Sequence, residues 1–326
     1  MKNKKIVITG GAGFIGSNLA TYFENLGADV LVVDIFRTGE RFDNGNLKSF
    51  GHYKNLLKFG GRVLEGDIND KKTLKSIAKF KPDAIFHEAA ISDTTVNDQS
   101  IMIKTNLNAF AKLLDICKEI DAKMIYASSA ATYGNAKSPQ RIWESEEPRN
   151  VYGFSKLMMD KLALKYHEKI HCIGLRYFNV YGENEFFKDK TASMVLQFGL
   201  QILNGQNPRL FEDSDKIKRD FVYIKDIVAI NHLAFLSDKS GVYNAATGVA
   251  RSFQEIVDIL QSELNTNLKC EYIKNPFIKQ YQFHTQADIS LSRQNLSYEP
   301  KFSLEDGIKS YIPEIKKIYE SIKNEA

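Results

Sequence analysis

A glycine turn close to the N-terminus constrains the fold of this chain more than any other feature. Glycines recur as Gly10-x-x-Gly13-x-x-Gly16 between a short apolar run, Lys5–Thr9, and a helical pattern that extends to Leu26. Residues without a side chain permit a tight turn and bring backbone N–H groups close to a pyrophosphate at the N-terminus of the helix. The pattern therefore predicts a strand–turn–helix unit that binds a dinucleotide.

The residues that follow this unit indicate a nucleotide site and leave its details open. A second apolar run, Asp29–Val33, ends at Asp34, whose carboxylate would accept a hydrogen bond from an adenosine ribose hydroxyl, which favours NAD. Arg37 and Arg41 follow in the same loop, where they hold the 2′-phosphate of NADP or are solvated charges. Asp67 would lie near the adenine amino group or belong to a turn.

Beyond this unit, short apolar runs alternate with helical patterns. The strand-like runs are Arg62–Glu65, Ala84–His87, Lys123–Ser128 and His171–Arg176, and the helical stretches are Asp70–Lys79, Thr105–Ile120 and Val151–His167. This alternation predicts an α/β fold with a Rossmann-like, doubly wound parallel sheet over residues 1–180. The rhythm is lost after Tyr181, so residues 181–326 are expected to form mainly a smaller, mixed α/β substrate-binding domain, with some segments returning to the first domain.

Composition excludes several classes of protein. The chain has 44 Lys and Arg against 40 Asp and Glu, and because the two signs alternate, no nucleic-acid partner is expected. Its three cysteines are scattered, without a CxxC pair or an HExxH sequence, which favours a reducing compartment and no metal site. No run approaches the ~20 apolar residues of a membrane span, and the apolar run at the N-terminus is too short for a signal peptide, so a cytoplasmic protein is expected.

A candidate catalytic group lies in the last helical stretch of the first domain. Tyr152 and Lys156 are one helical turn apart on one face. A nearby ammonium favours the phenolate of Tyr152 and makes it a feasible acid/base for a carbinol proton. Ser129 ends the preceding apolar run and supplies a hydroxyl that orients the reacting oxygen. A tyrosine and a lysine at this spacing also occur as a surface pair, but the serine and the glycine turn favour a catalytic set.

Four segments together resemble the extended short-chain dehydrogenase/reductases, which act on nucleotide-activated sugars. They are the glycine turn, SSAATYG at 128–134, YGFSK at 152–156 and RYFNVYG at 176–182. Within that superfamily the chain is most similar to the ADP-L-glycero-D-manno-heptose 6-epimerase family, through FHEAAIS at 86–92, YASSAATYG at 126–134, LFEDS at 210–214, KRDFVY at 218–223 and YQFHTQAD at 281–288. Two positions depart from this family, because KTAS at 190–193 replaces its Ser-Met-Ala-Ser stretch and Gln197 replaces its histidine.

The resemblance implies a reaction. The C-6 carbinol of an ADP-heptose would be oxidised by tightly bound NADP to a 6-keto intermediate, which is then reduced on its opposite face. Ser129, Tyr152 and Lys156 match the oxidoreductase centre, and Lys188 matches a second acid/base, although in sequence it reads as a surface lysine. The resemblance also implies a homo-oligomer, often a pentamer.

The same resemblance implies two sets of binding residues. The cofactor residues are Gly10, Gly13, Phe14, Ile15, Gly16, Asp34, Ile35, Arg41, Asp67, Glu88, Ala89, Ala90, Ile91, Ser92, Asn106, Lys156, Val180 and Lys188. The substrate residues are Asn179, Lys190, Gln197, Phe211, Glu212, Asp213, Ser214, Arg219 and Tyr281. Salt bridging is the alternative for Arg219, and core packing or capping is the alternative for Asn106.

Other functions stay open from the sequence. A hexose 4-epimerase, a 4,6-dehydratase or a reductase would share most of these segments. Dehydratases carry an Asp-Glu pair where this chain has AAT at 130–132, which argues against that activity. A regulator that binds a dinucleotide without turnover would have no need for Tyr152 and Lys156.

Overall fold

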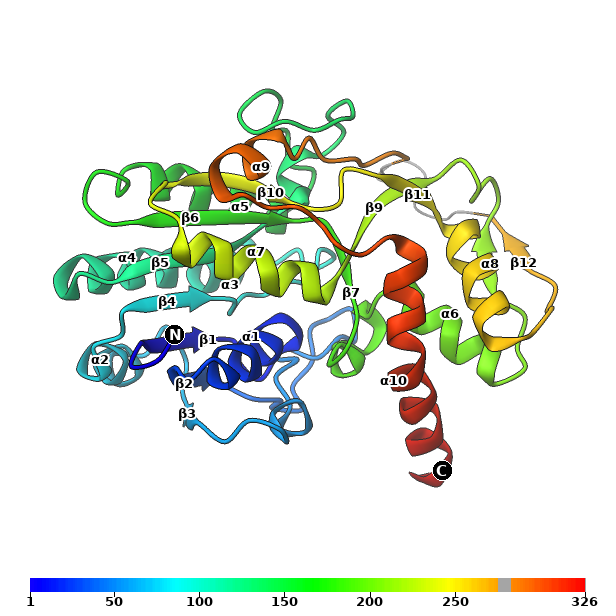
Figure 1. The fold of residues 1–326 in the computed structure, drawn as a ribbon, viewed down its shortest axis with the longest axis horizontal. Helices are drawn as coiled ribbons and strands as arrows, with labels where there is room; N and C mark the ends of the chain where they lie inside the picture. The colour runs from blue at the N-terminus through cyan, green and yellow to red at the C-terminus, as the bar shows by residue number, and fades with distance from the viewer. Residues whose placement is uncertain (275–282, 326) are drawn as a thin grey trace.

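A seven-stranded parallel sheet forms the centre of the molecule (Figure 1). The computed structural model describes residues 1–274 and 283–325. The strand order is β10-β6-β5-β4-β1-β2-β3, and every neighbouring pair is parallel. The strands are β1 (Lys5–Thr9), β2 (Asp29–Asp34), β3 (Arg62–Glu65), β4 (Ala84–His87), β5 (Lys123–Ser129), β6 (Cys172–Tyr177) and β10 (Gly241–Ala245). The predicted α/β class with a doubly wound parallel sheet is confirmed.

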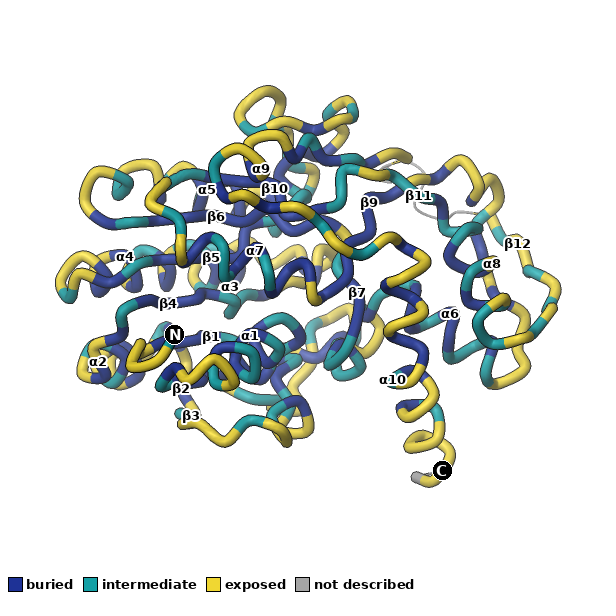
Figure 2. The backbone as a smooth tube through the Cα atoms, in the orientation of Figure 1, coloured by how far each residue is buried: buried dark blue, intermediate teal, exposed yellow. Residues whose placement is uncertain are grey.

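Helices cover both faces of this sheet, which explains why its strands are apolar without alternation. In β1, Ile6 and Ile8 belong to one hydrophobic cluster and Val7, between them, belongs to another. The first cluster includes residues of α1 (Phe14–Asn25) and α7 (Ile224–Leu236), and the second includes residues of α2 (Lys71–Phe80), α4 (Ala109–Ile120) and α5 (Val151–Leu164). Apart from the largely exposed edge strand β3, the strands therefore lie in the buried interior between two helical layers (Figure 2).

The later part of the chain adds a smaller, mixed α/β region. A three-stranded sheet has the order β11-β9-β7, and β12 pairs with β8. The strands are β7 (Asn179–Tyr181), β8 (Arg209–Phe211), β9 (Lys218–Tyr223), β11 (Ala250–Ser252) and β12 (Glu271–Ile273), and the helices are α6 (Met194–Leu203), α8 (Phe253–Leu264), α9 (Ser290–Leu296) and α10 (Leu304–Glu325). The helices α6, α8 and α10 pack against one another. Two elements of this part, α7 and β10, lie with the large sheet. The division of the chain into domains of residues 1–180 and 181–326 therefore stays a prediction.

Short helical turns connect these elements near the carboxyl edge of the sheet. They are η1 (Tyr53–Leu56), α3 (Gln99–Met102), η2 (Ile103–Asn108), η3 (Ala130–Tyr133) and η4 (Phe186–Thr191). The order of the strands reverses between β1 and β4, and in open α/β sheets ligands bind in the crevice at that point. A cavity of about 530 Å³ lies at this edge.

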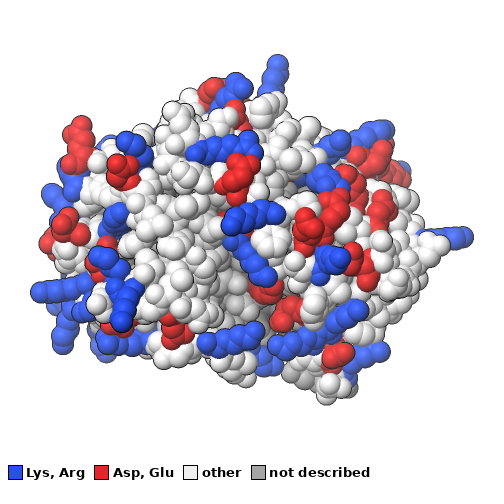
Figure 3. Space-filling model, in the orientation of Figure 1, with Lys and Arg blue, Asp and Glu red and all other residues white. Residues whose placement is uncertain are grey.

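The surface mixes charges of both signs. Basic and acidic side chains are interspersed on the face drawn in Figure 3. None of the helices in residues 1–274 and 283–325 combines the length and the apolar character that a bilayer span needs.

Candidate active site

Most of the residues that the sequence assigned to a cofactor line the large cavity. Its walls come from the glycine turn, the ends of β2, β4 and β5, the start of α5, and η4. The predicted cofactor residues that line it are Gly10, Gly13, Phe14, Ile15, Gly16, Asp34, Ile35, Asp67, Glu88, Ala89, Ala90, Ile91, Ser92, Lys156, Val180 and Lys188. Segments far apart in the sequence thus meet at one site.

The glycine turn has the geometry of an anion-binding site. Gly10 has a φ of +67°, and a Cβ atom there would lie 2.6 Å from the backbone nitrogen of Ala89. Gly13 is the N-cap of α1 and offers no side chain to the free N–H groups of the first turn. These groups, together with the positive end of the helix dipole, suit the pyrophosphate of a dinucleotide.

Asp34 lies at the adenosine end of this turn. One carboxylate oxygen accepts from the backbone N–H of Ala12 at 3.0 Å, and the other accepts from that of Phe36 at 2.7 Å. Burial raises the pKa of Asp34, although these backbone hydrogen bonds lower it. Its oxygens retain lone pairs for a ribose hydroxyl, so the residues present fit the expected group.

The two arginines after β2 do not line the large cavity. Arg41 donates to the backbone oxygen of Gly45 at 2.7 Å, and Arg37 donates to the backbone oxygen of Phe187 at 3.1 Å. Both line a second hollow of about 340 Å³. The basic side chain that does line the large cavity next to this loop is Lys48, which no motif in the sequence singled out.

The catalytic group predicted from the sequence is assembled where β5 meets α5. Tyr152 lies in the first turn of α5, behind an Asn150 cap that accepts from the N–H of Gly153 at 2.8 Å. Lys156 is 1% exposed, and its Nζ donates to the backbone oxygen of Ala127 at 2.6 Å. The side chains of Ser129, Tyr152 and Lys156 all line the cavity.

Burial and hydrogen bonding have opposite effects on the hydroxyl of Tyr152. Burial raises the pKa of Tyr152, while its hydrogen bond with Ser129 lowers it. The Nζ of Lys156 lies 5.9 Å from the centre of the tyrosine ring and donates to the backbone oxygen of Ala127. Burial thus opposes the phenolate form of Tyr152, and the role of Lys156 in favouring that form stays a prediction.

Two further ionisable groups of the cavity have displaced pKa values. Burial lowers the pKa of Lys156 to about 8, although Glu88 and Asp160 raise it. Burial also raises the pKa of Glu88 to about 7, although a hydrogen bond from Tyr177 and the charge of Lys156 lower it. The Tyr177 hydroxyl donates to Glu88 at 2.9 Å. Such displaced values are typical of sites that transfer protons.

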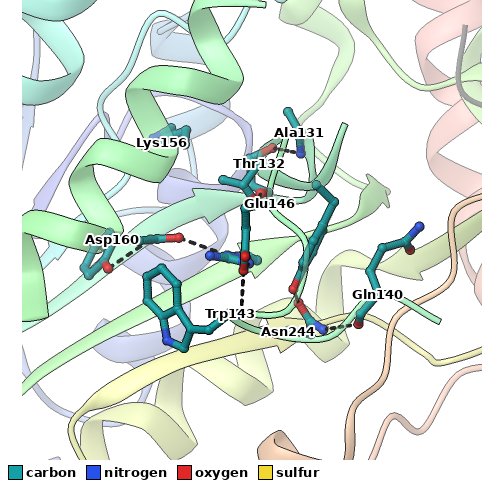
Figure 4. A network of polar contacts seen from close by, with 12 residues as sticks. Ala131, Thr132, Gln140, Trp143, Glu146, Lys156, Asp160 and Asn244 are labelled. Carbon is teal, nitrogen blue, oxygen red and sulfur yellow. Dashed lines mark hydrogen bonds and ion pairs between the residues drawn. The ribbon is translucent and has the colours of Figure 1, made fainter. Parts of the chain in front are cut away.

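A buried ion network supports α5 from behind (Figure 4). The Arg176 guanidinium, 0% exposed, pairs with Asp160 at 2.9 Å and with Glu146 at 2.6 Å. It lies over the rings of Tyr133 and Trp143, at 4.7 and 5.1 Å from their centres. Asp160 is one turn beyond Lys156 on α5, so this network holds the helix that carries Tyr152 and Lys156. Sequence reasoning missed it, because Glu146 lies in a loop without any recognisable pattern.

Lys188 reaches the same cavity from η4. Its Nζ lies 5.3 Å from the ring centre of Phe14, and the side chain is partly buried. Burial lowers the pKa of Lys188, although Glu185 raises it. The structure thus brings Lys188 into one cavity with Tyr152 and Lys156, where sequence alone indicated a surface residue.

The predicted substrate residues that the structure describes lie outside the large cavity. Gln197 lines the smaller hollow and donates to the backbone oxygen of Ala192 at 2.7 Å. Arg219 lies on β9 and donates to the backbone oxygen of Lys218 at 2.9 Å. Tyr281 falls outside the described residues. The other members are the exposed Asn179 and Lys190, Phe211 at the end of β8, and the turn residues Glu212, Asp213 and Ser214.

Asn106 does not line the cavity but supports residues of its wall. The side chain is 0% exposed, accepts from the Ile91 N–H at 2.8 Å and donates to the Ile91 oxygen at 3.0 Å. It also donates to the Ser155 hydroxyl at 3.1 Å. Asn106 therefore fixes the segment after β4 to α5.

In residues 1–274 and 283–325, no group of three or more His, Cys, Asp or Glu side chains could hold a metal ion.

Known proteins resemble this chain over nearly its whole length. Residues 6–246 match the NAD dependent epimerase/dehydratase family. An ADP-L-glycero-D-manno-heptose-6-epimerase from Brachyspira hyodysenteriae is 37% identical over 323 residues, which cover 96% of this chain and 98% of the relative. The crystal structure of the Helicobacter pylori ADP-L-glycero-D-manno-heptose-6-epimerase has 48% identity and a TM-score of 0.90 over 97% of each chain. A UDP-N-acetylglucosamine 4-epimerase from Methanobrevibacter ruminantium M1 has 28% identity and a TM-score of 0.85, over 98% of this chain and 99% of its own.

Proposed function

The chain belongs to the NAD dependent epimerase/dehydratase family, within it to the ADP-L-glycero-D-manno-heptose-6-epimerases, and we propose how its own residues carry out that reaction. The reaction inverts C-6 of the heptose in ADP-D-glycero-D-manno-heptose and gives ADP-L-glycero-D-manno-heptose. It supplies a precursor of the lipopolysaccharide core. When bound, the nicotinamide cofactor supplies the oxidation of the C-6 carbinol and the reduction of the resulting ketone.

One observation carries the mechanism: two proton-handling groups from separate elements line one cavity. Tyr152 comes from α5 and Lys188 from η4. A ketone reduced on the face opposite to the one that was oxidised needs a proton at the oxygen in two different orientations of the sugar. We assign Tyr152 to one orientation and Lys188 to the other.

The remaining polar groups of the centre hold this pair in place. Ser129 shares a hydrogen bond with the Tyr152 hydroxyl and orients the reacting oxygen. Lys156 is anchored on the backbone of β5, from where its ammonium can bind ribose hydroxyls and exchange a proton near neutral pH.

Substrate binding is assigned to β7 and the region that follows it. The guanidinium of Arg219 suits a diphosphate, because it offers parallel N–H donors. The other proposed contacts to the ADP-heptose come from Asn179, Lys190, Gln197, Phe211, Glu212, Asp213, Ser214 and Tyr281. The proposal includes a cytoplasmic homo-oligomer, as the family resemblance implies.

We propose NADP as the cofactor. Asp34 alone would favour NAD, but Lys48 lines the same cavity, and Arg37 and Arg41 lie in the loop between them. Mass spectrometry of the nucleotide released from denatured protein should find NADP. If the protein releases only NAD, this assignment is overturned.

Product analysis tests the function itself. Purified protein incubated with ADP-D-glycero-D-manno-heptose should give both C-6 epimers, resolved by ¹H NMR. A UDP-sugar 4-epimerase is the second candidate, favoured by the similarity to the Methanobrevibacter ruminantium enzyme. Turnover of UDP-glucose or UDP-N-acetylglucosamine without turnover of the ADP-heptose would establish that candidate instead.

A further inference from the structure

The segment that carries Lys188 is held firmly at its base. Glu185, 0% exposed, accepts from the Gly182 N–H at 3.1 Å and from the N–H and hydroxyl of Ser193 at 2.6 and 2.8 Å. These bonds join the two ends of the loop 182–193. They do not fix its middle, where Asp189 has a φ of +55° and interrupts the helical turn.

The middle of the loop is held by an aromatic contact. The Phe187 ring stacks on the His52 ring with 3.7 Å between the ring centres and 5° between the planes. The Arg37 guanidinium lies 5.7 Å from the same phenyl ring and also donates to the Phe187 backbone oxygen at 3.1 Å. Phe187 directly precedes Lys188, so this contact lies next to the proposed second proton-handling group.

His52 in turn is attached to the nucleotide-binding turn. Its backbone N–H donates to the Ala12 oxygen at 3.0 Å, and the Asn55 side chain donates to the same oxygen at 3.0 Å. The Ala12 N–H donates to the Asp34 carboxylate at 3.0 Å. A continuous set of contacts therefore runs from the adenosine end of the cavity through His52 to the loop of Lys188.

The loop has space to move if this contact is lost. Lys188 faces the large cavity, whereas Phe186, Phe187 and Asp189 line the hollow of about 340 Å³ on the other side. The loop therefore lies between the large cavity and the smaller hollow. Two other groups neighbour the Phe187 ring, namely the Arg37 guanidinium at 5.7 Å and the edge-on Phe186 ring at 5.2 Å between centres. His52 is the group that stacks flat on it.

We propose that His52 is a positioning residue for Lys188: by stacking on Phe187 it holds the Lys188 amine beside Phe14 in the large cavity. The inference rests on the proposed function, because it matters for turnover only if Lys188 handles a proton. It requires a flat, apolar face at position 52. It requires neither a charge nor the hydrogen bond that the His52 Nδ1 accepts from the Lys54 N–H at 3.1 Å.

Three variants separate the stack from other effects of position 52. His52→Ala removes the ring, and His52→Phe restores a flat ring without its nitrogens. Leu57→Ala, at a 73% exposed residue of the same connection, is the matched control. Each protein is studied with its bound cofactor, by steady-state kinetics on the ADP-heptose and by labelling of lysines with a succinimidyl ester, followed by peptide mass spectrometry.

His52→Ala should lower kcat by about tenfold, the scale of a lost aromatic stack, with KM and cofactor content unchanged. Lys188 should be labelled several-fold faster, because its amine becomes more exposed. His52→Phe should restore both values, and Leu57→Ala should match the unchanged protein.

Two results would overturn the inference. One is an unchanged labelling rate of Lys188 in His52→Ala, and the other is a His52→Phe protein as impaired as His52→Ala. If the unchanged protein fails to epimerise the ADP-heptose, the proposed function fails, and the labelling rates alone decide whether His52 positions Lys188.

Discussion

Two lysines with lowered pKa values line the cavity, and each has a different environment. Lys156 is enclosed and fixed to a backbone carbonyl, and burial lowers its pKa to about 8. Lys188 lies beside a phenyl ring and owes its lowered pKa to burial as well. Burial also raises the pKa of Tyr152. The state of each side chain is therefore set by its surroundings and not by residue type.

Tyr152→Phe tests the role of the hydroxyl. The variant keeps the ring and its packing, so the protein should fold and retain its cofactor. Epimerisation should fall by ~10²–10⁴-fold, the usual contribution of a positioned acid/base. Near-normal turnover of a folded Tyr152→Phe protein would show that the centre has been misassigned.

Glu88→Gln tests the electrostatics of the cavity through the pH dependence of stability. Because the pKa of Glu88 is raised from 4.5 to about 7, the folded protein binds more protons than the unfolded chain between these values. This group therefore stabilises the fold at low pH, and its contribution is lost as the pH rises through about 7.

In Glu88→Gln the side chain at position 88 stays uncharged at every pH. Its free energy of unfolding, relative to that of the unchanged protein, should therefore rise between about pH 5 and about pH 7. Urea unfolding across this range measures the difference. A constant difference would mean that the pKa of Glu88 is not displaced.

At the scale of elements, α5 shows what sequence patterns can predict. The spacing of Tyr152 and Lys156 placed both on one face of a helix, and the structure has a helix over Val151–Leu164. The partner of Asp160 could not be predicted, because Arg176 reaches it from a strand and in turn pairs with Glu146 from a loop. Periodicity describes contacts within an element, whereas this network depends on how separate elements pack.

Arg176→Met tests the network behind α5. The change leaves Asp160 and Glu146 buried without their cation, which should cost ~3–5 kcal/mol of the free energy of unfolding. Urea denaturation measures the loss. Fluorescence of Trp143, the single tryptophan of the chain, should also change, because the guanidinium lies over its ring.

An exposed ion pair provides the control for this variant. Arg293 pairs with Glu299 at 2.7 Å with both side chains more than half exposed, so Arg293→Met should cost ~0–1 kcal/mol. Equal losses for the two variants would mean that the buried network contributes no special support to α5.

At the scale of the whole molecule, the alternation of apolar runs and helical patterns was enough to predict the doubly wound sheet. The strand β10 (Gly241–Ala245) comes from the later part of the chain and forms one edge of this sheet. The sequence predicted only that some later segments return to the first domain, because parallel pairing joins strands far apart in the chain. Lys48 and the stack of His52 on Phe187 were not predicted, since loop conformation brings them to the site. Lys188 was identified through resemblance alone, because its burial depends on the packing of η4 beside α1.

The most direct test of the central claim compares Lys188→Met with the unchanged protein in conversion of ADP-D-glycero-D-manno-heptose, with the C-6 configuration followed by ¹H NMR. Methionine keeps the length of the side chain and removes the amine, so the variant should fold and retain its cofactor. The account predicts epimerisation slowed by ~10²-fold or more, because one face of the sugar loses its proton-handling group. Epimerisation at the normal rate by Lys188→Met, with Tyr152→Phe inactive in the same assay, would contradict the account and leave Tyr152 to serve both faces.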